Sequence, residues 1–341
     1  MFLWFSQGQT AVGKSAIASA HPLATEAGFE ILDRGGNAFD AAVAVSAALA
    51  VVEPAGSGLG GGGFWLLHRA KDGFEVMIDG REKAPLAAHR DMYLNESGAY
   101  DSISSKNGAL AAGIPGVPAG LVHLSEKYGR LPLAEVLKPA IRYARLGFVI
   151  GDKHRRMLGF RLPVINNDPE ASKILLVNSK APVEKMIFHQ PDLAKTLEKL
   201  ALLGKPGFYM GEIAGKLVDG VRAAGGIWTL KDLADYQVVE REPVRGEYHG
   251  IQVTSAALPS SGGIVLIETL NILSAFRLNE FDDATRKHLI VEALRRAYRD
   301  RAMYLGDCDF VDIPVEQLLS PVYAAGLRTT IRPDRALPSY L

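Results

Sequence analysis

Apolar residues recur three and four positions apart over most of the chain, which is the spacing of helices with one buried face. The most apolar stretch, residues 41–52, is broken only by Ser46, and its alanines predict a buried helix that packs closely. Gly35 and Gly36 are expected to end the helix before it, and Asn37 or a neighbouring residue is the candidate N-cap. Helices are also expected over residues 23–32, 119–128, 133–146, 193–203, 213–224, 264–273 and 285–303.

Few segments have the composition of strands. Residues 64–68 and 74–78 are apolar and flank a charged turn, and residues 244–248 and 251–255 flank His249 and Gly250 as a short hairpin. The polar segment 90–107 predicts a loop with a short helix, and residues 148–187 are too mixed to assign. Helices with few strands favour an α/β or α+β fold. No repeat or linker marks a boundary, so residues 1–341 are predicted to form a single domain.

The bulk composition is that of an ordinary globular protein. Of 341 residues, 48% are hydrophobic and 22% charged, and the formal net charge is +0. This balance argues against nucleic acid or an anionic membrane as the main partner, and the apolar run 41–52 is shorter than the roughly 20 residues of a membrane span. Cys308 is the only cysteine, which excludes an intrachain disulfide. The start, MFLWFSQ, lacks the basic residues and cleavage site of an intact secretory signal.

Residues 53–85 carry the most informative pattern. Consecutive glycines at 60–63 lead into the first strand and permit close approach of another backbone or a ligand. Arg81 comes just past the end of the second strand, where a sheet would present it to a ligand. An arginine held there is suited to gripping a carboxylate with two parallel charge-assisted hydrogen bonds. Arg81 is therefore the first candidate binding residue. The plainer alternative is a solvated arginine beside Glu82 and Lys83.

The same block resembles the gamma-glutamyltransferase family. The resemblance rests on GLGGGGF followed by the Asp-x-Arg-Glu-x-Ala-Pro string at residues 79–85. Further blocks follow the family order, at residues 33–54 (DRGGNAFDAAVAVSAALAVVEP), 113–120 (GIPGVPAG), 259–263 (PSSGG) with 270–273, and 300–307. Together they extend the resemblance over residues 15–341, nearly the whole chain.

The resemblance implies an α+β fold, the four-layer αββα sandwich of N-terminal-nucleophile hydrolases, built from two chains cut from one precursor. This sequence is similar to the large subunit only. Part of the sheet, and a catalytic N-terminal threonine, would come from the small subunit. That threonine would take the γ-glutamyl group of glutathione, glutamine or a related compound and pass it to amino acids, peptides, amines or water. The family location is periplasmic or secreted, and the cytoplasm stays open as an alternative.

The resemblance also assigns the site residues. Arg81 matches the arginine that binds the α-carboxylate of the glutamyl substrate. No catalytic residue is expected in this chain, and no cofactor or metal. Thr329 and Thr330 are followed by Ile331, unlike the family's nucleophile string, and are expected in helical sequence upstream of the cleavage point. An alternative within the family is an acylase of the glutaryl-cephalosporin type or a poly-γ-glutamate hydrolase.

Other chemical patterns are weaker. Residues 8–15, GQTAVGKS, match the phosphate-binding loop of nucleotide-binding proteins, but Pro22 comes early for the helix that must follow. The histidines are scattered, and Ser57 lacks the glycine two residues earlier that a nucleophile elbow requires. Ser260 and Ser261 are expected to cap the next helix. The acids around Cys308, Asp307 and Asp309, are too few to argue for a metal site.

Overall fold

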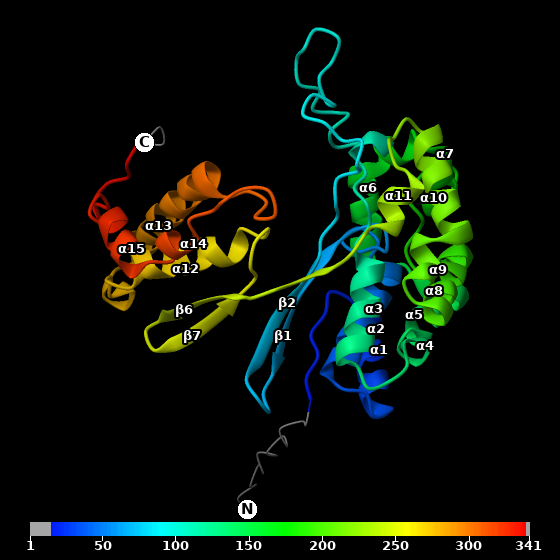
Figure 1. Ribbon diagram of the computed structural model, residues 1–341, viewed down its shortest axis with the longest axis horizontal. Coiled ribbons are helices and arrows are strands. Elements are labelled where there is room, and N and C mark those ends of the chain that lie inside the picture. Colours follow the sequence, from blue (N-terminus) through cyan, green and yellow to red (C-terminus); the bar gives the residue numbers. More distant parts are fainter. Residues whose placement is uncertain (1–14, 339–341) are drawn as a thin grey trace, which may run out of the picture. The chain divides into compact units, whose positions relative to one another are not determined.

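The structure, a computed structural model, describes residues 15–338 (Figure 1). It divides into two compact units. Unit 1 comprises the chain up to Gly63 together with Gly80–Val238, and unit 2 comprises Phe64–Asp79 and the chain from Val239 onward. Each unit is described by itself below. That residues 1–341 form a single domain stays a prediction.

Unit 1 is mainly helical, and its core surrounds the alanine-rich helix α2 (Ala38–Val52). Helix α2 packs against α1 (Pro22–Asp33), α3 (Val117–Tyr128) and α5 (Lys138–Leu146). Small side chains on α2, among them Ala44, Ala47 and Ala48, are fully buried and let these neighbours come close. The remaining elements are α4 (Leu133–Val136), β3 (Phe148–Val149), α6 (Asp152–Asn166), α7 (Pro169–Leu175), β4 (Ile187–Phe188), α8 (Pro191–Leu203), α9 (Pro206–Tyr209), α10 (Gly211–Ala223) and α11 (Leu230–Ala234).

The predicted start of α2 is confirmed. The side chain of Asn37 accepts hydrogen bonds from the backbone N–H groups of Phe39 (2.9 Å) and Asp40 (3.0 Å), and Asp40 accepts one in return from the N–H of Asn37 (2.8 Å). This reciprocal capping box satisfies donors that a helix start otherwise leaves unpaired. Asp40 is fully buried and also accepts from the N–H of Arg130, so the same cap ties α2 to the turn after α3.

Two predictions for unit 1 need correction. The helix expected over residues 133–146 forms as two helices that meet at Leu137, because Pro139 has no N–H to continue the hydrogen-bonding pattern. The segment 90–107 has turns but no helix, and a short 3₁₀ helix, η1 (Ala109–Ala111), follows it. The unassigned stretch 148–187 supplies α6, α7 and the β3–β4 pair.

Unit 2 contains the strands predicted from the sequence and one more. A three-stranded sheet has the order β1 (Gly63–Arg69), β2 (Phe74–Gly80), β5 (Val239–Arg241), and β5 pairs antiparallel to β2 with Met77 opposite Arg241. The hairpin of β6 (Val244–Tyr248) and β7 (Ile251–Ser255) forms as predicted. Its turn residues have positive φ angles, 50° at His249 and 81° at Gly250, which suit the tight turns of hairpins.

The helices of unit 2 are α12 (Gly262–Leu273), α13 (Asp283–Tyr304), α14 (Val315–Leu318) and α15 (Pro321–Arg328), with a 3₁₀ turn, η2 (Leu278–Glu280), before α13. Helix α12 contacts the other three, as Figure 1 shows. Their core includes Ile272 on α12, Leu289 and Ala293 on α13, and Ala324 on α15. A second buried cluster joins Leu258, Ile264 and Leu318.

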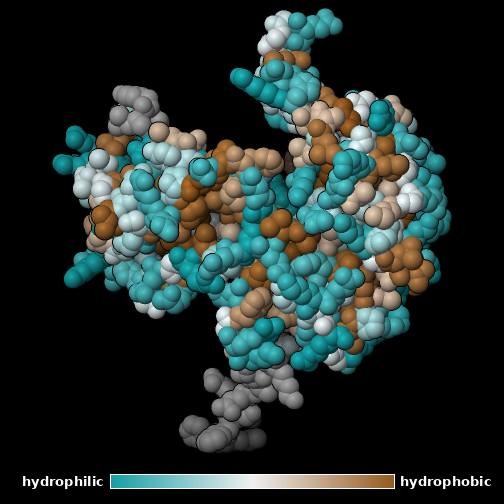
Figure 2. All heavy atoms as spheres, viewed as in Figure 1, coloured by the Kyte–Doolittle hydropathy of each residue, from teal (hydrophilic) through white to brown (hydrophobic). Residues whose placement is uncertain are grey.

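Apolar side chains also lie on the surface of unit 2. Phe310 and Val322 are 84% and 82% exposed, and Met303 on α13 is 65% exposed. Figure 2 shows brown apolar patches on the visible face of this unit. Among residues 15–338, no helix combines the length and apolar character that crossing a bilayer requires.

Candidate functional site

The glycine-rich loop packs backbone against backbone on the chain that follows β2. The N–H of Gly62 donates to Oε1 of Glu82 over 2.8 Å. A Cβ atom on Gly62 would lie 2.6 Å from the backbone nitrogen of Glu82 and 2.8 Å from the carbonyl oxygen of Gly80, so only glycine fits there. The carbonyl of Gly61 accepts from the N–H groups of Gly116 (2.9 Å) and Val117 (3.0 Å). The glycines therefore allow three backbone segments to meet.

The segment after β2 is held on its other side by residues 113–117. Lys83 and Ile114 exchange backbone hydrogen bonds of 3.2 and 2.7 Å, which makes an antiparallel bridge. Gly116 lies against the strand end so closely that a Cβ atom would overlap the carbonyl oxygen of Gly80 and the hydroxyl of Tyr236.

A buried tyrosine pair supports this arrangement. The hydroxyl of Tyr236 donates to the carbonyl oxygen of Arg81 over 2.7 Å. Its ring stacks on that of Tyr209, with centroids 5.5 Å apart and planes 9° from parallel. The Tyr209 hydroxyl donates to the carbonyl of Pro115 (2.8 Å) and accepts from the N–H of Ala119 (3.2 Å). Burial raises the pKa of Tyr209, so it remains a protonated donor.

We call residues 61–62, 80–83, 114–117 and Tyr236 the Arg81 cradle. All of them belong to unit 1. The guanidinium of Arg81 extends from this rigid support with its side chain 59% exposed, and its Nη1 lies 3.5 Å from Oε2 of Glu82. Such a long contact at the surface is weak. The cradle fixes the backbone of Arg81, while more than half of the side-chain surface stays exposed.

Asp79, which opens the string at residues 79–85, has a structural role in unit 2. It is 7% exposed and accepts a 2.7 Å hydrogen bond from Nε of Arg241 on β5. The guanidinium nitrogens Nη1 and Nη2 of Arg241 bind both carboxylate oxygens of Asp309 (2.8 and 2.7 Å). The hydrogen bond with Asp309, and then the one with Asp79, raises the pKa of Arg241. Neither β5 nor this ion pair is predicted from the local sequence.

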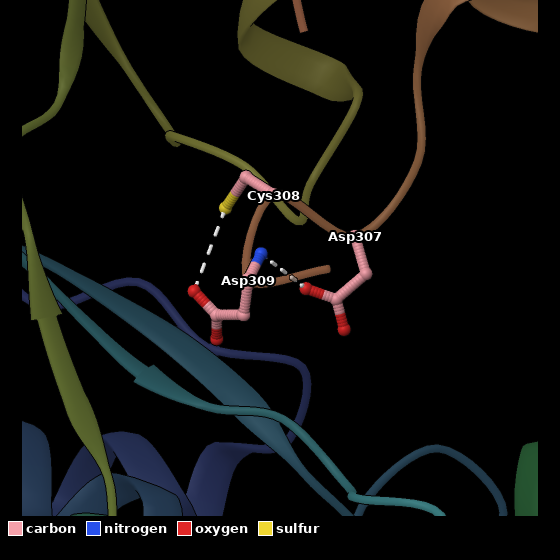
Figure 3. Close-up of side chains that lie close together, drawn as sticks. All are labelled: Asp307, Cys308 and Asp309. Atoms are coloured by element: carbon pink, nitrogen blue, oxygen red, sulfur yellow. Dashed lines mark hydrogen bonds between the residues drawn. The ribbon is translucent and has the colours of Figure 1, made fainter. Parts of the chain in front are cut away.

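The cluster of Asp307, Cys308 and Asp309 resembles a metal site by proximity only (Figure 3). One ligand atom of each lies within 4.8 Å of the others. However, Arg241 neutralises the Asp309 carboxylate, and Asp307 accepts a hydrogen bond from the backbone N–H of Asp309 (3.0 Å). Burial raises the pKa of the Cys308 thiol, which disfavours the thiolate that a metal needs. These contacts occupy the acids within the protein, and two acids remain too few to argue for a metal site.

The hydroxyl residues singled out in the sequence have structural partners. Ser260 accepts from the N–H of Gly262 (3.3 Å) at the start of α12, as predicted, whereas Ser261 accepts from Nε of Arg301 (2.9 Å). The expectation that Thr329 and Thr330 lie in a helix is wrong, because α15 ends at Arg328. The Thr330 hydroxyl binds the buried Arg296 at 2.7 Å. The GQTAVGKS motif lies outside the described residues, except for Ser15.

Unit 2 contains a buried pair of acids. Glu268 on α12 is 1% exposed, and its Oε1 has no hydrogen-bond partner among the described residues. Burial, and then the charge of Asp300 on α13, raise the pKa of Glu268 to about 8. Asp300 is fully buried, bound by Arg299 (2.8 Å) and by the hydroxyl of Tyr323 on α15 (2.6 Å). Glu268 is therefore protonated at neutral pH, and its ionisation would place two like charges side by side.

Replacing Glu268 with glutamine should flatten the pH dependence of stability. The unfolded chain releases the Glu268 proton near pH 4.5 and the folded chain near pH 8, so the wild-type protein loses stability as the pH rises through this range. Glutamine cannot ionise. When the pH is raised from about 6 to about 9, the unfolding free energy of the Glu268→Gln protein should therefore fall by about 2–3 kcal/mol less than that of the wild-type protein. Urea unfolding at both pH values measures this difference. Parallel pH profiles for the two proteins would contradict the buried acid pair.

Comparisons with known proteins agree on one family. The model of the family Gamma-glutamyltranspeptidase matches residues 24–340. The glutathione hydrolase proenzyme of Pseudomonas sp. (strain A14) is 42% identical over 336 residues, covering 97% of this chain and 58% of that protein. The acylase ACY 1 proenzyme of Pseudomonas sp. (strain SE83) is 37% identical over 332 residues, covering 95% of this chain and 59% of that protein.

A solved structure is similar over nearly its whole length. The gamma-glutamyltranspeptidase of Helicobacter pylori superposes with a TM-score of 0.93 at 40% identity, covering 97% of this chain and 96% of the solved chain. By contrast, the chain spans less than three fifths of the length of the curated proenzymes it matches.

Proposed function

Because the chain belongs to the gamma-glutamyltranspeptidase family, we propose that it is the large subunit of an enzyme that transfers γ-glutamyl groups. The predicted family is confirmed, and so is the predicted fold type, which the chain shares with the Helicobacter pylori enzyme. The activity itself is an inference from relatives that are named glutathione hydrolase proenzymes and extend well beyond this chain.

The proposed reaction uses a nucleophile that this chain does not carry. An N-terminal threonine on the small subunit, cut from the same precursor, would attack the γ-carbonyl carbon of the donor. Its own α-amine would take the hydroxyl proton and then return a proton to the departing amine. The acyl-enzyme would pass the γ-glutamyl group to an amino acid, peptide or amine, or to water. Two observations support a reaction shared between two subunits. The relatives are named proenzymes, and this chain covers less than three fifths of their length.

Arg81 is the residue of this chain that would bind the substrate. The single observation behind this assignment is the cradle, which holds the backbone of Arg81 while its side chain stays 59% exposed. A guanidinium offers two parallel N–H groups that match a carboxylate. Gripping the α-carboxylate at one end of the donor would orient the γ-carbonyl at the other end toward the nucleophile. Such positioning lowers the barrier as well as strengthening binding.

The alternative within the family is an acylase specific for glutaryl groups. This alternative is supported by the similarity of the chain to the acylase ACY 1 proenzyme. A glutaryl group retains the distal carboxylate that Arg81 would bind but lacks the α-amine. Comparing kcat/KM on γ-glutamyl and glutaryl anilides therefore separates the two functions. We expect a clear preference for the γ-glutamyl anilide, and equal rates would contradict a γ-glutamyltransferase.

The small subunit should copurify with this chain. When the precursor is expressed, we expect it to separate into this chain and a second polypeptide beginning with threonine. Replacing that threonine with alanine should leave the precursor uncut. N-terminal sequencing and intact mass measure both results. Without its partner this chain should be poorly soluble, since exposed apolar side chains such as Phe310 and Val322 would remain uncovered. A soluble monomer, with no second polypeptide from the precursor, would contradict the proposal.

We propose, from the family resemblance alone, that the protein works in the periplasm or outside the cell, with the cytoplasm as the alternative. Fractionation of cells that express the full precursor tests this location.

A further inference from the structure

We infer that Tyr236 is a positioning residue for substrate binding, because its hydroxyl fixes the backbone from which the Arg81 guanidinium extends. The inference rests on the proposed role of Arg81 and adds a residue that lies 155 positions away in the sequence. Tyr236 itself need not touch the substrate.

The hydrogen bond is made to residue 81 itself. The Tyr236 hydroxyl donates to the carbonyl oxygen of Arg81 over 2.7 Å. The other cradle contacts act on the neighbouring residues, since Gly62 binds the side chain of Glu82 and Ile114 pairs with the backbone of Lys83. Losing the Tyr236 contact would leave the peptide group between residues 81 and 82 able to rotate while its neighbours stay in place.

Such a rotation would change the direction in which the Arg81 side chain leaves the backbone. It is a long side chain, 59% exposed, and its contact with Glu82 is 3.5 Å long. The orientation of the guanidinium therefore depends on the orientation of the backbone at residue 81. Two-pronged binding of a carboxylate depends on that direction, because both N–H groups must align at once.

Tyr236 is in turn held rigidly. It is 2% exposed and stacks on Tyr209, and the ammonium of Lys83 lies 5.7 Å from its ring centroid. Its hydroxyl occupies the space that a side chain at position 116 would need, since a Cβ atom on Gly116 would overlap it. Tyrosine at this position combines a packed ring with one directed hydrogen bond.

The Tyr236→Phe variant separates these two contributions, because phenylalanine keeps the stacking and removes only the hydroxyl. It should be studied in the processed two-chain enzyme, with rates normalised to the amount of cleaved protein. Two donors are compared, a γ-glutamyl anilide and a γ-aminobutyryl anilide, which keeps the amine but lacks the carboxylate. We expect KM for the γ-glutamyl anilide to rise about 5- to 30-fold, with a smaller change in kcat. The rate on the γ-aminobutyryl anilide should change little, so discrimination between the donors falls.

Tyr93→Phe is the matched control. The Tyr93 hydroxyl also donates to a backbone carbonyl, that of Leu110 (3.2 Å), but Tyr93 is not part of the cradle. This variant should retain wild-type KM values for both donors. Introducing 3-fluorotyrosine at position 236 keeps the ring, restores the hydroxyl and should restore KM. It also provides a folded protein to measure if the phenylalanine variant is not cleaved.

Two results would overturn the inference. One is a Tyr236→Phe enzyme with wild-type KM for the γ-glutamyl anilide. The other is an equal loss on both donors, which would mark Tyr236 as merely structural. Arg81→Lys, measured alongside, distinguishes these failures from failure of the proposed function. If Arg81→Lys also leaves donor discrimination unchanged, the role of Arg81 fails. If Arg81→Lys lowers donor discrimination but Tyr236→Phe leaves it unchanged, only the inference about Tyr236 fails.

Discussion

Replacing Arg81 with lysine is expected to lower kcat/KM for a γ-glutamyl anilide by about 10- to 150-fold, which corresponds to about 1.5–3 kcal/mol of transition-state binding. Lysine keeps the positive charge but presents a single ammonium, so it cannot make two parallel hydrogen bonds to the α-carboxylate. Steady-state kinetics on the processed enzyme measures the loss.

Two controls accompany this variant. The rate on a γ-aminobutyryl anilide, which has no carboxylate for Arg81 to bind, should change by less than about twofold. Arg90→Lys alters an arginine that is 97% exposed and 4.0 Å from its acidic neighbour, and it should behave as wild type. Equal kcat/KM for Arg81→Lys and the wild-type enzyme would remove Arg81 from the substrate site.

Replacing Gly116 with alanine is expected to destabilise the protein by about 3 kcal/mol and to abolish most activity. The backbone angles of Gly116 (φ −115°, ψ −24°) are open to alanine, so the cost comes from space and not from backbone strain. The added methyl group would overlap the carbonyl of Gly80 and the hydroxyl of Tyr236, and at least one of them must move. Movement of the Gly80 carbonyl shifts the end of β2 just before Arg81, and movement of the Tyr236 hydroxyl weakens its hydrogen bond to the Arg81 carbonyl. Urea unfolding and kinetics measure the two effects.

Gly215→Ala is the matched control for that change. Gly215 lies within α10, and a Cβ atom there would have no heavy atom within 4 Å. The same substitution should therefore stabilise the protein by about 0.5–1 kcal/mol, because alanine favours the helix. Wild-type stability and activity in Gly116→Ala would show that the cradle is less tightly packed than the structure indicates.

Local patterns predicted much of the fold. The helices around α2 and in unit 2, the cap at Asn37, and the β6–β7 hairpin follow from periodicity and from turn residues that lie close together in the chain. The position of Arg81 just after β2 was predictable for the same reason. The proposed reaction, in contrast, came from the family resemblance and not from any of these patterns.

The parts that could not be predicted depend on contacts between distant residues. Strand β5 is three residues long, Val239–Arg241, and only its pairing with β2 makes it a strand. The bond between Arg241 and Asp79 spans 162 positions, and nothing near either residue indicates the other. Tyr236 likewise follows a short helix as one tyrosine among several. Its role becomes visible only when its hydroxyl is found on the carbonyl of Arg81.

The most direct test of the account is a crystal structure of the processed two-chain enzyme with L-glutamate bound. The account predicts both oxygens of the glutamate α-carboxylate at about 2.7–2.9 Å from two nitrogens of the Arg81 guanidinium, with the side-chain carboxyl group next to the N-terminal threonine. Glutamate bound through another cation, with Arg81 directed into solvent, would contradict it.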